Sequence, residues 1–201
     1  MDTLRFILDR YKIDMNGAPF PIKIPASRWH DMGRLFNDLG FKKGVELGVY
    51  RGMFTERLAK GAPNTEFIGI DAWTSYPGYI EYEKNDLEND AYAHAMEKLK
   101  RFKNVRIIKA WSLDGAKMFE DESLDFVFID ANHNYENVVA DIAAWSKKVR
   151  PGGIVSGHDY LRFKKHRFGV IEAVNGWCSA YDISPLFVWR DMCPSWMYVK
   201  E

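Results

Sequence analysis

Short apolar segments alternate with amphipathic segments from residue 28 onward, and this alternation limits the fold more than any other feature of the chain. The segments with the length of buried strands are 44–48, 66–71, 105–108, 124–130 and 153–157. Two further apolar segments, 185–189 and 196–199, are too close together for a parallel crossover and predict an antiparallel hairpin. The pattern predicts an α/β fold with a mostly parallel seven-stranded sheet, a C-terminal antiparallel hairpin and helices on both faces.

The N-terminal region interrupts this pattern. Residues 1–15 predict a short helix, and a cluster of Gly and Pro predicts an irregular segment over 16–27. The length of 201 residues fits one domain. We therefore expect a single domain over 1–201, in which 1–27 form a lid or cap segment and 74–90 form an insertion near the ligand site.

The charge balance limits the class of partner. Lys and Arg total 28, as do Asp and Glu, so the formal net charge is zero and no field of one sign attracts nucleic acid or an anionic membrane. The two cysteines are too few for a disulfide framework, and we identify no signal peptide and no apolar run that spans a bilayer. We expect a cytoplasmic protein with a small-molecule partner. A homo-oligomer is compatible with the sequence, which leaves the oligomeric state open.

In parallel sheets of this kind, ligands bind beyond the carboxyl ends of the strands. Gly48 and Gly52 follow the first predicted strand and let a ligand approach the backbone. Asp71 ends the second strand at the spacing that favours binding of two ribose hydroxyls, although a helix cap or a solvated loop acid is the alternative. Ser112 follows the third strand, and its alternative roles are contact with a base edge and capping of a helix over 113–119.

Acidic and imidazole groups follow the last two parallel strands. Asp130 and His133 follow one strand, and His158 and Asp159 follow the next. Neighbouring strands bring these groups together, which favours a divalent cation site with His133 as a general base beside it. An ordinary hydrogen-bonded His–Asp pair is the alternative.

Four segments occur in an order and spacing that resemble a known family: ELGVYRG, FIGIDAW, DFVFIDANHNYE and VRPGGIVSGHDY. The chain resembles the class I S-adenosylmethionine-dependent methyltransferases, and within them the small metal-dependent sugar and macrolide O-methyltransferases of the macrocin type. It is more distantly similar to catechol O-methyltransferase and to the cephalosporin hydroxylase group.

The resemblance implies roles for individual residues. His133 would be the catalytic base, and Asp130, His158 and Asp159 would hold a divalent cation, expected to be Mg²⁺. The residues that would bind S-adenosyl-L-methionine are Glu46, Gly48, Tyr50, Gly52, Asp71, Trp73, Ser112 and Asp130. The macrocin-type enzymes carry an acid where this chain has His158. A histidine favours softer cations such as Mn²⁺ or Fe²⁺, or leaves His158 outside the ligand set.

These features predict an O-methyltransferase that acts on a hydroxyl of a small acceptor, such as a sugar, a glycoside or another natural product. A metal-dependent hydroxylase or oxygenase of the cephalosporin hydroxylase type and a non-catalytic S-adenosylmethionine-binding module are the alternatives. Residues with the chemistry to stack on an acceptor ring are Tyr76, Tyr79, Tyr82, Tyr160 and Phe163, and the basic run 162–167 has the charge to attract an anionic acceptor.

Overall fold

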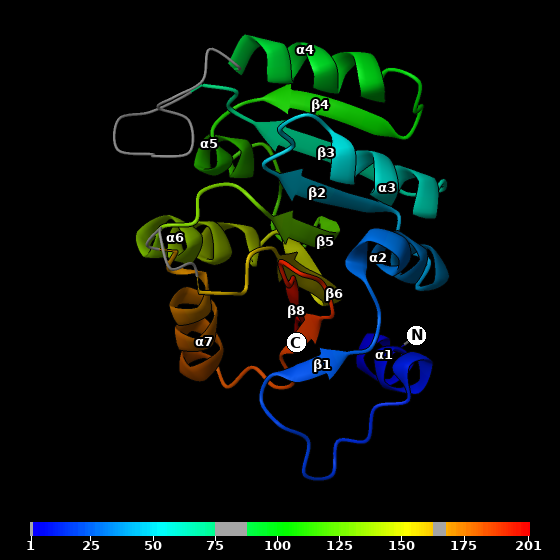
Figure 1. Ribbon diagram of the computed structural model, residues 1–201, viewed down its shortest axis with the longest axis vertical. Helices are drawn as coiled ribbons and strands as arrows, with labels where there is room; N and C mark the ends of the chain where they lie inside the picture. The colour runs from blue at the N-terminus through cyan, green and yellow to red at the C-terminus, as the bar shows by residue number, and fades with distance from the viewer. Residues whose placement is uncertain (1, 75–87, 163–167) are drawn as a thin grey trace.

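The computed structural model describes residues 2–74, 88–162 and 168–201, which form one mixed sheet of eight strands with helices on both faces (Figure 1). The strands are β1 (Ile22–Ile24), β2 (Lys43–Leu47), β3 (Glu66–Asp71), β4 (Val105–Lys109), β5 (Leu124–Ile129), β6 (Val149–Gly157), β7 (Phe187–Trp189) and β8 (Trp196–Val199). The helices are α1 (Thr3–Tyr11), α2 (Arg28–Asp38), α3 (Met53–Gly61), α4 (Glu88–Leu99), α5 (Ser112–Ala116), α6 (Tyr135–Trp145) and α7 (Val170–Ala180).

The strand order β1-β7-β8-β6-β5-β2-β3-β4 confirms the predicted α/β fold. Strands β2 to β6 are parallel to their neighbours within this group, and β8 is antiparallel to both β6 and β7. The predicted hairpin is therefore present. The carboxyl ends of β2, β3, β5 and β6 lie at one edge of the sheet, where ligands of such folds bind.

The predicted number of seven strands is wrong, because the segment expected to be irregular contains β1. This strand pairs in parallel with β7, and its pattern is buried, exposed, buried over Ile22, Lys23 and Ile24. Three alternating residues between two prolines are too short a signal to predict a strand. These three residues nevertheless form a strand, because β7 would otherwise have an unpaired edge with which they can hydrogen-bond.

Two helical layers cover the sheet (Figure 1). Helices α1, α2 and α3 pack on one face over a core that includes Phe36, Phe126 and Phe128. Helices α5, α6 and α7 pack on the other face over Trp145 and its aliphatic neighbours. Both faces of β5 are thus buried, so the strand holds the residues that follow it in fixed positions.

No helix within residues 2–74, 88–162 and 168–201 has the length and apolar character that a membrane span requires.

Candidate active site

The turn after β2 depends on glycine. Gly48, Tyr50 and Gly52 have φ angles of 80°, 50° and 71°, in the left-handed region that glycine adopts without strain. A Cβ atom on Gly48 would lie 1.8 Å from the carbonyl oxygen of Asp130. The absence of a side chain therefore brings the turn after β2 into direct contact with the end of β5, and Gly52 then begins α3 as its N-cap.

Asp71 is fixed at the end of β3 by two backbone amides. Its Oδ2 accepts a hydrogen bond of 2.8 Å from the amide of Tyr50, and its Oδ1 accepts one of 2.8 Å from the amide of Trp73. Burial raises the pKa of Asp71 above its ordinary value, while these backbone hydrogen bonds act in the opposite direction. Each carboxylate oxygen has a second lone pair, so binding of ribose hydroxyls stays compatible with this geometry.

Trp73 contacts the turn of residues 48–52 that follows β2, which we call the glycine turn. Its side chain is buried, its Nε1 donates a hydrogen bond of 2.8 Å to the carbonyl oxygen of Tyr50, and its ring contacts Tyr92 edge-on. The ring therefore supports the turn, and the predicted contact with adenine stays a prediction.

Ser112 connects α5 to α6. Its hydroxyl donates to Asp141 and accepts a hydrogen bond of 2.9 Å from Trp145 Nε1. Ser112 is the first residue of α5, and the N-cap is Trp111, which makes no side-chain capping bond. The alternative of Ser112 as an N-cap is therefore wrong. Burial raises the pKa of Asp141 to about 6, although the Ser112 hydrogen bond opposes this shift.

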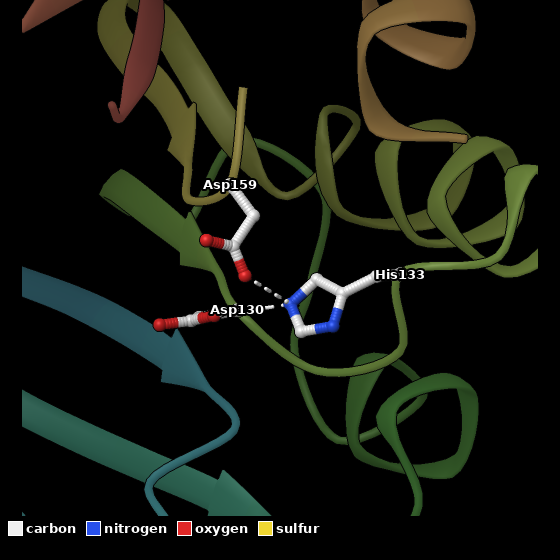
Figure 2. A group of neighbouring side chains, drawn as sticks. All are labelled: Asp130, His133 and Asp159. Carbon is white, nitrogen blue, oxygen red and sulfur yellow. Dashed lines mark hydrogen bonds and ion pairs between the residues drawn. The ribbon is translucent and has the colours of Figure 1, made fainter. Parts of the chain in front are cut away.

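Asp130, His133 and Asp159 converge at the carboxyl ends of β5 and β6 (Figure 2). His133 Nε2 lies 3.1 Å from Asp159 Oδ2 and 3.4 Å from Asp130 Oδ1. One ligand atom from each of the three residues lies within 4.8 Å of the others, so within the described residues they form a candidate group for a metal ion. Asp159 has a φ of 55°, an uncommon backbone conformation that Asp tolerates better than most residues.

The ring of His133 is held from its other side by Phe168. The two rings stack with centroids 4.6 Å apart, and the carbonyl oxygen of His133 accepts a hydrogen bond of 2.8 Å from the amide of Gly169. The segment that precedes α7 thus fixes the orientation of the imidazole, which sequence spacing alone did not indicate.

His158 lies beside the same carboxylates but has contacts on both ring nitrogens. Its Nδ1 lies 3.4 Å from Asp130 Oδ2 and 3.2 Å from Asp159 Oδ1, while its Nε2 lies 3.0 Å from the carbonyl oxygen of Cys193 and 2.8 Å from Arg28 Nη2. Burial alone would lower the pKa of His158, but hydrogen bonds with Asp130 and Asp159 raise it to about 9. The geometry therefore favours a hydrogen-bonding role for His158 toward the two carboxylates.

The two imidazoles also stabilise the charged form of Asp130. Burial by itself would raise the pKa of this carboxyl group, yet hydrogen bonds from His133 and His158 hold it well below its ordinary value. Asp130 is thus an anion that is stabilised by the imidazole rings of His133 and His158. This explains how a carboxylate can follow a buried strand.

Two buried ionisable residues complete the site. Glu46, on β2, is 2% exposed, and burial raises its pKa to about 8. Arg28, the first residue of α2, is 5% exposed and packs its guanidinium 4.2 Å from the ring centroid of Phe54. Sequence reasoning missed Arg28, because nothing in its local sequence distinguishes it from a solvated helical arginine.

The predicted acceptor-binding residues fall into two groups. Tyr76, Tyr79, Tyr82, Phe163 and positions 164–167 of the basic run lie outside the described residues. Tyr160 is described, and its hydroxyl donates a hydrogen bond of 2.6 Å to Asn175 Oδ1 on α7. Arg162 pairs with Glu172 at 2.7 Å. The predicted role of these residues in acceptor binding stays a prediction.

A protein-family profile described as "Methyltransferase domain" matches residues 45–160, more than half of the chain. The chain belongs to this methyltransferase family. The match includes the glycine turn, Asp71 and the carboxylates that follow β5 and β6. It confirms the expected methyltransferase domain, whereas the macrocin subtype stays a prediction.

Solved structures share the fold of this methyltransferase. A candidate caffeoyl-CoA O-methyltransferase from Staphylococcus aureus is 16% identical to this chain. The match covers 98% of this chain and 90% of the S. aureus chain, with a TM-score of 0.63. An O-methyltransferase from Bacillus cereus, solved in complex with SAH, is 18% identical to this chain. The match covers 100% of this chain and 91% of the B. cereus chain, with a TM-score of 0.59.

The methyltransferase is also similar to part of a curated protein. An uncharacterized protein of Sinorhizobium fredii is 28% identical over 154 residues, which are 73% of this chain and 16% of that protein. The chain thus spans about a sixth of the length of this relative.

Proposed function

We propose that this methyltransferase transfers a methyl group to a hydroxyl oxygen of a small acceptor, such as a sugar, a glycoside or another natural product. The observation that carries the proposal is the convergence of Asp130, His133 and Asp159 beside the glycine turn of a methyltransferase domain. The S. aureus and B. cereus structures with the same fold are described as O-methyltransferases, which supports oxygen as the methylated atom.

The methyl donor is bound, in this proposal, along the carboxyl ends of β2, β3 and β4. S-adenosylmethionine supplies a methyl group that is already electrophilic on its sulfonium, so the protein mainly has to align the acceptor oxygen. Asp71 binds the ribose hydroxyls, and Gly48 and Gly52 let the donor approach the backbone. The remaining donor contacts come from Glu46, Tyr50, Trp73, Ser112 and Asp130.

The residues beyond β5 and β6 fit a divalent cation. Two carboxylate oxygens and one imidazole nitrogen point at one another, and such a set of acceptors is stabilised by a positive charge among them. We propose that Asp130 and Asp159 hold a cation such as Mg²⁺, with His133 as the candidate nitrogen ligand and His158 as a hydrogen-bond donor to the two carboxylates. A bound divalent cation lowers the pKa of a coordinated hydroxyl.

His133 is the proposed proton acceptor. The carboxylates of Asp159 and Asp130, at 3.1 Å and 3.4 Å from Nε2, stabilise the imidazolium that forms when the ring takes up a proton. A role of His133 as a metal ligand uses the same nitrogen, so an experiment has to separate the two roles.

Donor binding is tested by thermal unfolding with S-adenosylhomocysteine. A ligand at 100 times its Kd stabilises the folded state by about 2.7 kcal/mol, which raises the melting temperature by several degrees. Asp71→Asn should lose most of this rise, whereas Asp114→Asn, a change of an exposed acid on α5, should keep it. Absence of a rise in the unaltered protein would contradict the proposal.

The acceptor and the cation are tested by methyl transfer from radiolabelled S-adenosylmethionine to a panel of sugar nucleotides, glycosides and catechols, with Mg²⁺, Mn²⁺ or a chelator. Asp159→Asn should abolish transfer and leave S-adenosylhomocysteine binding largely intact, because Asp159 belongs to the proposed cation site and not to the proposed donor site. Calorimetry of Mn²⁺ binding to His133→Gln separates the two roles of His133. If His133 is the base, the variant should keep Mn²⁺ binding. If His133 is a ligand, the variant should lose most of it. Undiminished transfer in chelator would rule out the cation.

A further inference from the structure

Arg28 is a buried cation with unused hydrogen-bond donors at the site. Its Nη2 lies 2.8 Å from His158 Nε2, but its Nε and Nη1 are buried and have no hydrogen-bond partner within the described residues. Leaving buried donors of a charged group unpaired is costly, so native structures rarely retain them without a ligand or ordered water.

Arg28 is also held rigidly. Its guanidinium lies 4.2 Å from the ring centroid of Phe54 and 4.7 Å from that of Trp29. Its backbone amide donates a hydrogen bond of 2.9 Å to Asp191 Oδ2, from the loop that joins β7 to β8. Two elements besides its own helix, α3 and the β7–β8 loop, therefore fix the arginine before any ligand arrives, which lowers the entropic cost of binding.

Glu46 supplies a complementary acceptor. It lies on β2, directly before the glycine turn, and its Oε2 is buried with no hydrogen-bond partner among the described residues. Glu46 is paired with Phe128 in the sheet, and the Arg28 guanidinium lies 5.6 Å from the ring centroid of Phe128, so Arg28 and Glu46 lie in the same part of the site. The site thus contains unpaired donors and an unpaired acceptor, both at least nine-tenths buried.

The surrounding charges select the kind of ligand. Four carboxyl groups act on Arg28, those of Asp130, Asp191, Glu46 and Asp159. These acidic groups stabilise a positive charge that is placed beside the arginine. A group that carries a carboxylate and an ammonium on neighbouring atoms has no net charge, and it satisfies the arginine donors and the glutamate oxygen together.

We propose that Arg28 binds the α-carboxylate of the methyl donor, while Glu46 accepts a hydrogen bond from its α-ammonium group. The inference rests on the proposed function, since S-adenosylmethionine carries an α-amino-acid end. It adds a binding residue from α2, outside the glycine turn and outside the region matched by the methyltransferase profile.

The test compares two ligands by calorimetry: S-adenosylhomocysteine and its analogue without the α-carboxylate. The unaltered protein should bind S-adenosylhomocysteine about 10- to 100-fold more tightly than the analogue, as expected for a charge-assisted hydrogen bond. Arg28→Gln should weaken binding of S-adenosylhomocysteine to the level of the analogue and leave binding of the analogue unchanged. Arg34→Gln, at an exposed position of the same helix, should behave as the unaltered protein does.

Equal affinity of the unaltered protein for the two ligands would overturn the inference. This comparison needs no variant, so it tests the inference even if Arg28→Gln does not fold. A folded Arg28→Gln variant that keeps the preference for the carboxylate would overturn it as well. In both cases the proposed function stands. Failure of the unaltered protein to bind S-adenosylhomocysteine would instead overturn the proposed function, and the inference with it.

Discussion

At the scale of single residues, Gly48 controls how closely the turn after β2 approaches the end of β5. In Gly48→Ala, the added Cβ would lie 1.8 Å from the Asp130 carbonyl oxygen, so the end of β5 has to move. We expect a loss of more than about 3 kcal/mol in the free energy of unfolding, measured with urea, and loss of S-adenosylhomocysteine binding.

Gly40→Ala is the matched control for this change. Gly40 has a φ of 71°, close to the 80° of Gly48, but nothing lies within 4 Å of the position of its Cβ. This variant should lose only about 1 kcal/mol from backbone strain and keep ligand binding. Equal losses in the two variants would show that backbone strain, and not contact with Asp130, makes Gly48 necessary.

Glu46 makes the stability of the protein depend on pH. Burial raises its pKa from 4.5 to about 8, so between these values the folded state binds more protons than the unfolded state. The contribution of Glu46 therefore lowers the free energy of unfolding as pH rises through this range. Glu46→Gln should remove this contribution and gain on the order of a few kcal/mol over the unaltered protein at pH 8.5, with a smaller gain at pH 5.

Urea unfolding at both pH values measures this difference without ligand. Glu66→Gln is a suitable control, because Glu66 is exposed at the start of β3. The control should follow the pH dependence of the unaltered protein. A Glu46→Gln variant that follows it too would contradict a raised pKa of Glu46 in the folded state.

At the scale of elements, the loop between β7 and β8 holds the start of α2. Asp191 accepts a hydrogen bond of 2.5 Å from Ser27 Oγ and one of 2.9 Å from the amide of Arg28, and so acts as an N-cap supplied from a distant part of the chain. Asp191→Ala should cost about 1–2 kcal/mol in the free energy of unfolding. It should also weaken S-adenosylhomocysteine binding, because Arg28 is no longer fixed.

Ser27→Ala separates these effects, since it removes one of the two hydrogen bonds and keeps the one to the Arg28 amide. We expect a smaller loss of stability and nearly unchanged ligand affinity from this variant. If both variants bind the ligand as tightly as the unaltered protein, the loop stabilises α2 without positioning Arg28.

The same elements show which parts of the site a sequence can predict. Asp130 and Asp159 were predictable because each follows an apolar strand, and ends of neighbouring parallel strands meet at one edge of the sheet. The two contacts of His158 Nε2 were not, since one is a backbone carbonyl, at Cys193, and the other is Arg28, 130 positions away in the chain. Contacts of this kind depend on how elements pack and leave no local pattern.

At the scale of the whole molecule, the site joins two halves of one sheet. The glycine turn and Asp71 belong to β2 and β3, while the carboxylates of Asp130 and Asp159 follow β5 and β6. The halves meet where Gly48 contacts the end of β5, because β2 and β5 are neighbours in the sheet. A proposed donor site on one half and a proposed acceptor site on the other are thus brought together by strand order.

The N-terminal segment, expected to be a lid or cap, is tied into this sheet in the structure. Ile7 on α1 is fully buried in the same cluster as Ile22, Ile24 and Trp189. Thr3 Oγ1 donates a hydrogen bond of 2.6 Å to the carbonyl oxygen of Gly152 on β6. These contacts favour a segment that unfolds together with the domain.

Ile7→Ala distinguishes a packed segment from a separable lid. If α1 is part of the common core, the variant should lose about 2–4 kcal/mol in the free energy of unfolding. Tryptophan fluorescence and far-UV circular dichroism should then report one coincident transition in urea. Met15→Ala, at a side chain that is 41% exposed, should change the free energy by less than about 0.5 kcal/mol. A main transition that Ile7→Ala leaves unchanged would instead indicate that α1 detaches before the sheet unfolds, as a lid does.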